Sequence, residues 1–486
     1  MAAPDVPLES LRGRWIVAAA VLGSGIAFLD GSLVNIALPA IGEDLDASLI
    51  GLQWIVSAYL VTLSAFVLLG GSLGDELGRR RVFVIGLVIF SGGSVVCSVA
   101  PSTGVLIAAR AVQGVGGALL VPGSMSIIGT TIHPDDRPRA YGVWSGLAGA
   151  ASAVGGFLGG WLIDAVSWRL IFLINVPLTL LTVAITIRHV PETKAPGDRT
   201  LDLPGAALVS VALGAISYAA IEHDGASSLA MFALGVGALA IFVAVERRSS
   251  HPMLPLRVFR SRQFTGTNLA TFAIYAGLGG AMFLLALRLQ VSLGYSALEA
   301  GAATLPFTVL MLVISPAAGQ VSQRIGPRWP MTIGPLITAA GIWVMHTISP
   351  GDAFATVVLP AVVLLGLGMA ITVAPLTAAV LGSVGGDLTG VASGVSNAVA
   401  RTAGMLAVAA LPALAGITAA SGLAAGLDDG YGLALQIAAG FTAVGGLISA
   451  LLVRDAVSVR PIVHPSPVFA CHDPALATPD ATPQAA

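Results

Sequence analysis

Long apolar segments alternate with short polar connections along the chain from about residue 15 to residue 453. Within each segment the apolar residues run without a break, whereas the strands of a membrane β-barrel alternate apolar and polar positions. Most segments are long enough for a helix to cross the hydrocarbon core of a bilayer, so we predict about 14 membrane-spanning helices. The expected spans are 15–39, 51–73, 82–100, 104–130, 141–165, 169–188, 203–221, 228–246, 264–289, 298–322, 331–349, 353–383, 389–420 and 430–453.

The composition points to the same class of protein. Of the 486 residues, 56% are hydrophobic and 10% are charged, and the mean hydropathy is +0.91. A soluble domain usually contains about 25% charged residues, so a soluble protein of this length is excluded. The predicted fold class is an all-α membrane protein.

The two ends of the chain are polar. Residues 1–14 form a short N-terminal segment, and the apolar run 15–39 is too long for a signal-peptide core and is interrupted by Asp30. We therefore interpret this run as a retained first span. The segment 454–486 is rich in Pro, Ala and Thr, a composition typical of a disordered tail.

Basic residues predict the orientation. Nineteen of the 23 Lys and Arg residues fall in one set of alternate connections and tails, and two, Arg169 and Arg288, fall in the other. Loops on the cytoplasmic side carry an excess of Lys and Arg. The pattern predicts an even number of spans and places both termini in the cytoplasm.

Two connections resemble each other. The segments Gly71 to Arg80 and Gly319 to Arg328 share Gly at the first position, an aliphatic residue and Gly at offsets six and seven, and Arg at offset nine. Internal repeats of this kind are typical of secondary transporters. The predicted organisation is a cytoplasmic N-terminus at 1–14, six-helix halves at 15–188 and 264–453, an inserted helix pair at 203–246, a basic cytoplasmic linker at 247–263 and a disordered cytoplasmic tail at 454–486.

Several motifs carry a family resemblance. They are GSLGDELGRRR at 71–81, the run from Arg110 to Gly117, the run from Leu29 to Pro39, the run from Ser167 to Pro177, and the run from Leu289 to Gly301 followed by Pro306. The first resembles the signature loop of the major facilitator superfamily. The second resembles that family's arginine motif, and the others resemble motifs of its fourteen-span drug:proton antiporters. The resemblance covers roughly residues 14–453 and implies two six-helix halves that rock about a midplane cavity.

Asp30 and Arg110 are predicted to lie at a similar depth in the outer half of the membrane. At 1.5 Å per residue, Asp30 lies about 24 Å from the inner edge and Arg110 about 9 Å from the outer end of its span. An Asp inside a span is costly unless it is paired or hydrated, and Arg keeps its charge. The resemblance favours proton coupling by this pair, and the alternative is a static ion pair that fixes helix packing.

Four further polar residues are candidates for the substrate cavity, namely Asn35, Gln113, Asn397 and Arg401. Gln113 lies one turn from Arg110, so it either hydrogen-bonds that side chain or lines the cavity. Arg401 lies about 18 Å into its span, without an acid at comparable depth in the second half. It either binds an anionic group or pairs across the halves. The fixed positive charge of Arg401, with no acid beside it, predicts neutral, zwitterionic or weakly anionic substrates rather than dications.

The loop at 71–81 is the candidate cytoplasmic gate. In the family an acid at the position of Asp75 engages arginines and the N-terminus of span 11, and helix N-termini attract anions. The alternative is a solvated basic loop with a turn glycine. The predicted gate residues are Gly71, Asp75, Gly78, Arg79 and Arg80.

Span 5 is rich in glycine. Gly155 with Gly159, and Gly156 with Gly160, form two pairs of small residues at a spacing that lets helices approach closely. The antiporter motif has Gly-Pro where this chain has Gly155 and Gly156, so the kink that Pro would introduce is missing. These four glycines are predicted either to form a hinge or to serve packing alone.

The sequence lacks the motifs that other function classes require. The single lysine, Lys194, is not part of a Walker A loop, and no zinc-protease or nucleophile-elbow motif is present. Cys97 and Cys471 do not suggest a disulfide or a metal site. The net charge of −2 does not imply a nucleic-acid partner. We expect no enzyme activity, no cofactor and no metal.

The sequence thus predicts a secondary transporter in a bacterial cytoplasmic membrane. The favoured function is proton-coupled export of hydrophobic drugs or antibiotics, with small substrates, protons and the lipid bilayer as partners. A symporter or exchanger for a metabolite or lipid is the alternative, and a membrane enzyme or sensor is a remote one. The sequence leaves the substrate, the choice of proton or sodium, and the oligomeric state open.

Overall fold

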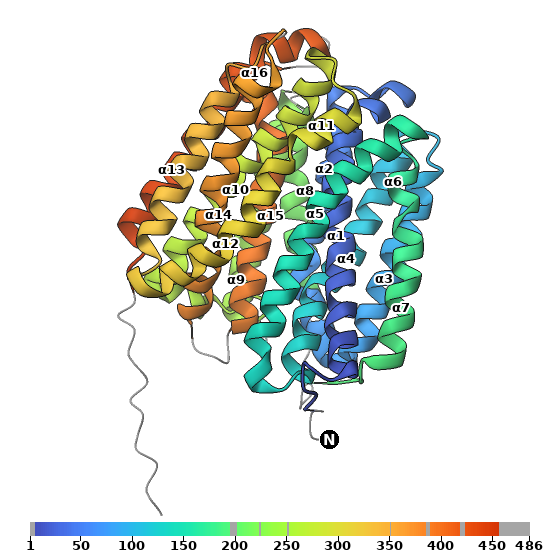
Figure 1. Ribbon diagram of the computed structural model, residues 1–486, viewed down its shortest axis with the longest axis vertical. Coiled ribbons are helices and arrows are strands. Elements are labelled where there is room, and N and C mark those ends of the chain that lie inside the picture. Colours follow the sequence, from blue (N-terminus) through green and yellow to red (C-terminus); the bar gives the residue numbers. More distant parts are fainter. Residues whose placement is uncertain are drawn as a thin grey trace, which may run out of the picture.

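The computed structural model describes residues 5–194, 202–222, 225–249, 252–349, 351–384, 389–417 and 423–455. Within these ranges the chain is helical and forms no strand, and its helices run side by side in an elongated bundle (Figure 1). The predicted disordered tail lies outside the described residues from residue 456 onward.

The first part of the chain supplies nine α-helices and one 3-10 turn. They are α1 (Leu11–Asp44), α2 (Leu49–Leu77), α3 (Arg79–Ser98), α4 (Thr103–Thr131), η1 (Pro134–Asp136), α5 (Arg137–Ala165), α6 (Leu170–Leu173), α7 (Asn175–His189), α8 (Leu203–Glu222) and α9 (Ala226–Arg248). The sixth predicted span is therefore divided into α6 and α7, which follow each other directly.

The remaining helices follow a 3-10 turn in the linker. They are η2 (Leu256–Arg260), α10 (Arg262–Leu287), the π-helical turn η3 (Arg288–Ser292), α11 (Ala297–Ala303), α12 (Leu305–Ile325), α13 (Arg328–Met345), the π-helical turn η4 (Phe354–Val358), α14 (Leu359–Gly382), α15 (Thr389–Leu414) and α16 (Leu423–Leu452). The short helix α11 and the helix α12 together fill the tenth predicted span.

Twelve helices in the described part of the chain are long and apolar enough to cross a membrane. Each coincides with one predicted span. The two other predicted spans, 141–165 and 331–349, coincide with α5 and α13, which are not among the twelve. The all-helical membrane fold is therefore confirmed, while the count of fourteen spans stays a prediction.

Serine residues occupy the N-cap position of five helices in the described part of the chain. In each case the serine side chain accepts a hydrogen bond from a backbone amide in the first helical turn, which satisfies a donor that would otherwise lack a partner. The five N-caps are Ser10, Ser48, Ser102, Ser261 and Ser296. Further along each helix, backbone hydrogen bonding is internal, as a helix in lipid requires.

Large apolar side chains cover the outside of the bundle. Leu180, Leu229 and Val313 are each about two-thirds exposed, at 66%, 70% and 68%. A soluble protein rarely exposes so much contiguous apolar surface, so this exterior fits contact with lipid.

In the first half of the chain, α1 packs on α5, and α4 packs on both α2 and α3. In the second half, α10 packs on α15 and α16, and α14 packs on α12 and α13. Helices α8 and α9 pack on each other, and α8 also contacts α2 and α15. The long contact between α2 and α15 joins the two parts of the chain.

The end of the bundle that carries the N-terminal segment is called the N-face below, and the opposite end the far face. At the N-face, Val6 pairs with Ile132 beyond the end of α4, and Arg12 donates to the carbonyl of His189 at the end of α7. The turn between α2 and α3 lies at the same end, since the amide of Arg79 donates to the carbonyl of Thr193 just after α7.

Candidate functional site

Asp30 and Arg110 form an ion pair inside the bundle. The Oδ2 atom of Asp30 on α1 lies 2.5 Å from the Nη1 atom of Arg110 on α4. Their side chains are only 1% and 2% exposed. The pairing confirms the similar depth that was expected for the two residues.

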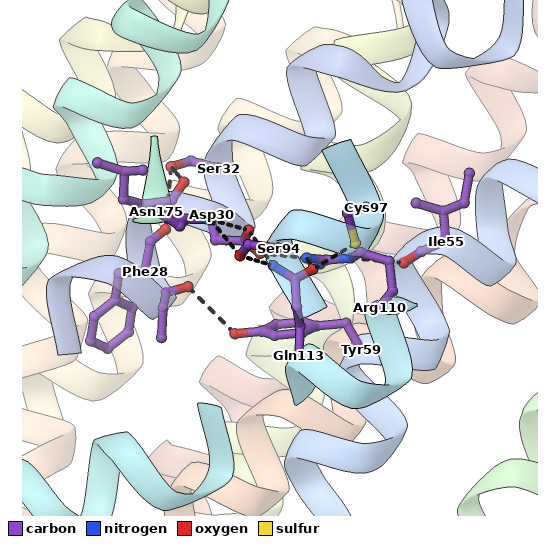
Figure 2. A network of polar contacts seen from close by, with 12 residues as sticks. Phe28, Asp30, Ser32, Ile55, Tyr59, Ser94, Cys97, Arg110, Gln113 and Asn175 are labelled. Carbon is purple, nitrogen blue, oxygen red and sulfur yellow. Dashed lines mark hydrogen bonds and ion pairs between the residues drawn. The ribbon is translucent and has the colours of Figure 1, made fainter. Parts of the chain in front are cut away.

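A network of neutral side chains surrounds the carboxylate (Figure 2). Its second oxygen, Oδ1, accepts hydrogen bonds from the amide of Asn175 at 3.0 Å and from the amide of Gln113 at 3.3 Å. Both amides also donate to the hydroxyl of Ser94, at 3.2 and 2.7 Å. Helices α1, α3, α4 and α7 thus meet at Asp30, and every group that contacts its oxygens is a donor.

Arg110 has partners besides Asp30. Its Nη1 donates to the side-chain oxygen of Gln113 at 2.9 Å and its Nε to the carbonyl of Ile55 at 3.3 Å. The guanidinium carbon lies 4.3 Å from the centre of the Tyr59 ring, within the range of a cation–π contact. Gln113 therefore takes the first of its two expected roles, the hydrogen bond to Arg110.

Sequence reasoning missed Asn175 and Ser94. Asn175 begins α7, directly after the break between α6 and α7, and it is fully buried. It belongs to the run from Ser167 to Pro177 that carries the family resemblance, and an Asn in an apolar span was the available signal. Ser94 on α3 had no such signal, because a lone serine in a span normally bonds to its own helix.

A small cavity lies in the second half of the chain. It measures about 80 Å³ and lies between α10, α14 and α15, toward the N-face. Hydroxyl and amide groups line one side of it, from Thr271, Tyr275, Ser393, Ser396 and Asn397. Of the predicted substrate-cavity residues, only Asn397 lines this space.

The other predicted cavity residues lie elsewhere. Asn35 is half-buried on α1, and Gln113 is enclosed in the Asp30 network. Arg401 follows Asn397 by one turn, and its guanidinium lies 5.6 Å from the ring centre of Phe28 on α1. The four residues therefore do not share one space, although Arg401 does bridge the two parts of the chain.

The predicted gate loop forms a tight turn at the N-face. Asp75 and Arg79 form an ion pair at 2.6 Å within this segment. Gly78 has a φ of +108°, a value that favours glycine. Glu192, just after α7, accepts from the amide of Arg80 at 3.0 Å and so caps the start of α3.

The family pattern and the structure differ in the helix that lies beside this loop. Span 11 corresponds to α13, and the amide at its start, on Arg328, donates to Asp455 at 3.1 Å. Helix α2 instead packs along α15. Helix α15, which corresponds to predicted span 13, therefore lies beside α2 where the resemblance implied span 11.

The glycines of span 5 face two different helices. A Cβ atom on Gly155 would lie 2.5 Å from the hydroxyl of Ser32 on α1, and one on Gly159 would lie 2.4 Å from Leu33. On the other face, a Cβ on Gly160 would lie 2.4 Å from the carbonyl of Ala297. Helix α5 runs unbroken through this segment.

The second glycine face packs against α11 at the far face. Gly301 on α11 lies against Gly156, where an added Cβ would come within 2.2 Å of the Gly156 carbonyl. Asp164 at the end of α5 accepts from the first two amides of α11, those of Ala297 at 3.1 Å and Leu298 at 2.8 Å. The two parts of the chain are thus joined here by backbone packing and a helix cap.

Toward the N-face the same helices separate (Figure 1). A Cβ on Gly146 of α5 would have no neighbour within 4 Å. Leu147 on α5 and Val321 on α12 are 53% and 49% exposed. The bundle is therefore more tightly joined between α5 and α11–α12 at the far face than at the N-face.

Fold and site together define a polytopic membrane protein with a charged centre buried between its helices. The chain belongs to the Major Facilitator Superfamily, whose family model matches residues 20–409.

Its relatives are drug and antibiotic resistance transporters. The chain is 34% identical to the Tetracenomycin C resistance and export protein of Streptomyces glaucescens, over 84% of this chain and 77% of that one. It is 33% identical to the Puromycin resistance protein pur8 of Streptomyces alboniger, over 92% of this chain and 94% of that one. These matches confirm the family that the motifs predicted and indicate a transporter rather than an enzyme.

Solved structures share the fold. A crystal structure of the peptide transporter POT in complex with sulfate superposes with a TM-score of 0.69 and 16% sequence identity, covering 92% of this chain and 96% of that one. At this identity the similarity concerns the fold alone.

Proposed function

We propose that this chain exports small hydrophobic drugs or antibiotics across the cytoplasmic membrane of a bacterium in exchange for protons. Relatives named for tetracenomycin C export and puromycin resistance support the substrate class. The observation that carries the proton coupling is the Asp30–Arg110 pair, because it places a carboxylate inside the helix bundle beside a cation that keeps its charge.

Protonation of Asp30 would change how α1 is held. The ionised carboxylate accepts from Arg110, Gln113 and Asn175, on α4 and α7. A neutral Asp30 would lose the ion pair, while Arg110 would keep the Gln113 oxygen, the Ile55 carbonyl and the Tyr59 ring. The proton therefore weakens the attachment of α1 to α4 and α7 without leaving the guanidinium bare.

Helix α5 would transmit this change to the far face. Ser32 and Leu33, within one turn of Asp30, contact Gly155 and Gly159 of α5. The opposite face of α5 packs on α11 through Gly160. A shift of α1 would therefore reach the contact that joins the two parts of the chain, as alternating access requires. In this proposal the glycines allow helices to slide, and no kink is needed.

The proposed organisation is two six-helix halves, 15–188 and 264–453, with the pair 203–246 inserted between them. The N-face is proposed to be cytoplasmic, because the basic clusters at Arg79 to Arg81 and at Arg137 and Arg139 lie there. The tighter contact at the far face then fits a state that is closed to the outside.

Transport by proteoliposomes tests this function. Tetracenomycin C uptake is measured into vesicles that contain the purified protein, with a pH gradient imposed in either direction or dissipated by a protonophore. Uptake that follows the direction of the gradient in the wild type, and is lost in Asp30→Asn, supports proton-coupled export. Uptake by the wild type that ignores the gradient, or follows a sodium gradient instead, contradicts it.

A further inference from the structure

Arg401 differs from the other arginines that are embedded in the helices. Arg110 forms an ion pair with Asp30. Arg288 forms an ion pair with Asp428, whose side chain is about half exposed. Among the described residues, no carboxylate lies within ion-pair distance of Arg401, and its Nε atom is buried without a hydrogen-bond partner. A guanidinium cannot lose its proton inside a protein, so this cation is left without a counter-charge.

An aromatic ring of α1 lies beside Arg401. The guanidinium carbon lies 5.6 Å from the ring centre of Phe28. A ring stabilises a cation through its face, but it does not neutralise the charge, and it does not supply the oxygen pair that a guanidinium binds best.

Among the described residues, Tyr59 makes a cation–π contact with Arg110 of the proton-coupling pair and not with Arg401, whose ring contact is Phe28. The Tyr59 ring stacks at 4.3 Å from the guanidinium carbon of Arg110, on the side of the Asp30 network. The charge of Arg110 is balanced by Asp30, whereas that of Arg401 is not. The two arginines therefore lie in different electrostatic environments.

The polar cavity between α10, α14 and α15 lies within one helical turn of Arg401 along α15. Tyr275 and Asn397 line the cavity, and Asn397 lies one turn before Arg401 on the same face of α15. The volume of about 80 Å³ holds two or three water molecules at ~30 Å³ each, or one small polar group of a larger molecule. The space is thus large enough for a polar functional group.

We propose that Arg401 binds an anionic oxygen group of the transported molecule, a carboxylate or an ionised phenol, while Phe28 and Tyr275 contact its apolar body. This assignment rests on the export function proposed above and names its substrate class as acidic amphiphiles. The neighbouring cavity adds two further donors, the second amide hydrogen of Asn397 and the hydroxyl of Ser396. A dication would meet the uncompensated charge of Arg401 and is rejected.

A matched pair of probes tests the site, pyrenebutyrate and pyrenebutanol, which share their apolar body and differ in charge. Binding to the purified protein is measured by fluorescence, and gradient-driven uptake is measured in proteoliposomes. The wild type should bind the acid more tightly. Arg401→Gln should weaken binding of the acid about tenfold or more, as the loss of one charge-assisted hydrogen bond does, and should change binding of the alcohol less than about threefold.

Two further variants serve as controls. Arg401→Lys keeps the charge and should retain part of the preference for the acid. Arg324→Gln removes an exposed cation at the N-face and should leave both affinities unchanged. A monodisperse elution profile for each variant separates loss of binding from loss of folding.

The outcomes distinguish the anion site from the export function. Equal affinity of the wild type for both probes, or an equal loss of both in Arg401→Gln, overturns the anion site. If gradient-driven uptake of pyrenebutanol persists in that case, the export function stands. If the wild type moves neither probe in response to a pH gradient, the export function and the site that rests on it both fail.

Discussion

Gly78 and Gly326 occupy the same register in the two repeated loops of the chain, and each has a positive φ, +108° and +86°. Each is covered by an acid from the end of its own half. A Cβ on Gly78 would lie 2.6 Å from Glu192, and one on Gly326 would lie 2.0 Å from Asp455. The same acids accept from the amides of Arg80 and Arg328, the Arg at offset nine of each loop. The sequence repeat is therefore also a structural one.

Replacing Gly78 with Ala should destabilise the turn between α2 and α3. The backbone conformation is one that residues with a Cβ rarely adopt, at a penalty of about 1–3 kcal/mol, and the new methyl would displace Glu192 from the start of α3. We expect a lower thermal unfolding temperature and slower transport. Gly71→Ala is the matched control, because its Cβ would lie 3.9 Å from Pro122 in ordinary contact. Equal unfolding temperatures for the two variants would contradict this account.

The Asp30–Arg110 pair should behave as one unit. Asp30→Asn leaves Arg110 buried without its counter-charge, and Arg110→Gln leaves Asp30 without its cation, so each change should destabilise the protein by about 3–5 kcal/mol. The double variant removes both charges and should recover much of that stability. Proton-driven export should stay absent in all three, while exchange of substrate without a gradient should persist in the double variant.

Thermal unfolding and proteoliposome transport measure the two parts of this prediction separately. Stability losses that simply add in the double variant would show that the two charges do not interact. Wild-type coupling in the double variant would show that the pair only holds the helices together, which is the alternative that the sequence left open.

Asn175 should support the export that depends on Asp30. Its amide donates to the Asp30 carboxylate at 3.0 Å, so Asn175→Leu removes one of the hydrogen bonds that hold α1 to α7. Proton-driven export should fall by about tenfold, the size expected for the loss of one charge-assisted hydrogen bond. Thr179→Val is the matched control, since its buried hydroxyl on the same helix has no hydrogen-bond partner among the described residues. Export at the wild-type rate in Asn175→Leu would exclude this role.

Hydropathy and depth were sufficient to predict much of the architecture. The apolar runs located the helices within a few residues, and counting residues from the ends of two spans placed Asp30 level with Arg110. Both inferences rest on the fixed rise of a helix across a layer of fixed thickness. They need no knowledge of which helices are neighbours.

What the sequence did not contain was the rotation of each helix about its axis. Gln113 and Arg401 were both candidates for the substrate cavity, yet Gln113 faces α3 in the Asp30 network and Arg401 faces α1. Ser94 and Asn175 complete the network from helices that carry no charge at that depth. Side-chain direction depends on packing between distant segments, and a strongly apolar helix has little amphipathic pattern from which to infer it.

Gly160 gives the sharpest test of the contact at the far face. A Cβ there would lie 2.4 Å from the carbonyl of Ala297 and 2.6 Å from the Cα atom of Leu298, both backbone atoms that cannot rotate away. Gly156, one turn earlier on the same face of α5, has room, since a Cβ would lie 3.4 Å from the hydroxyl of Thr304.

Gly160→Ala should therefore push α5 away from α11 by about 1 Å and penalise the closed far face by about 1–3 kcal/mol, the usual effect of overpacking. Because alternating access links the two ends, the N-face should close in compensation. Spin labels at the exposed positions Leu147 on α5 and Val321 on α12 should then report a shorter distance than in the wild type. Gly156→Ala should leave that distance unchanged. A distance that does not shorten in Gly160→Ala would mean that this glycine contact does not control which end of the bundle is open.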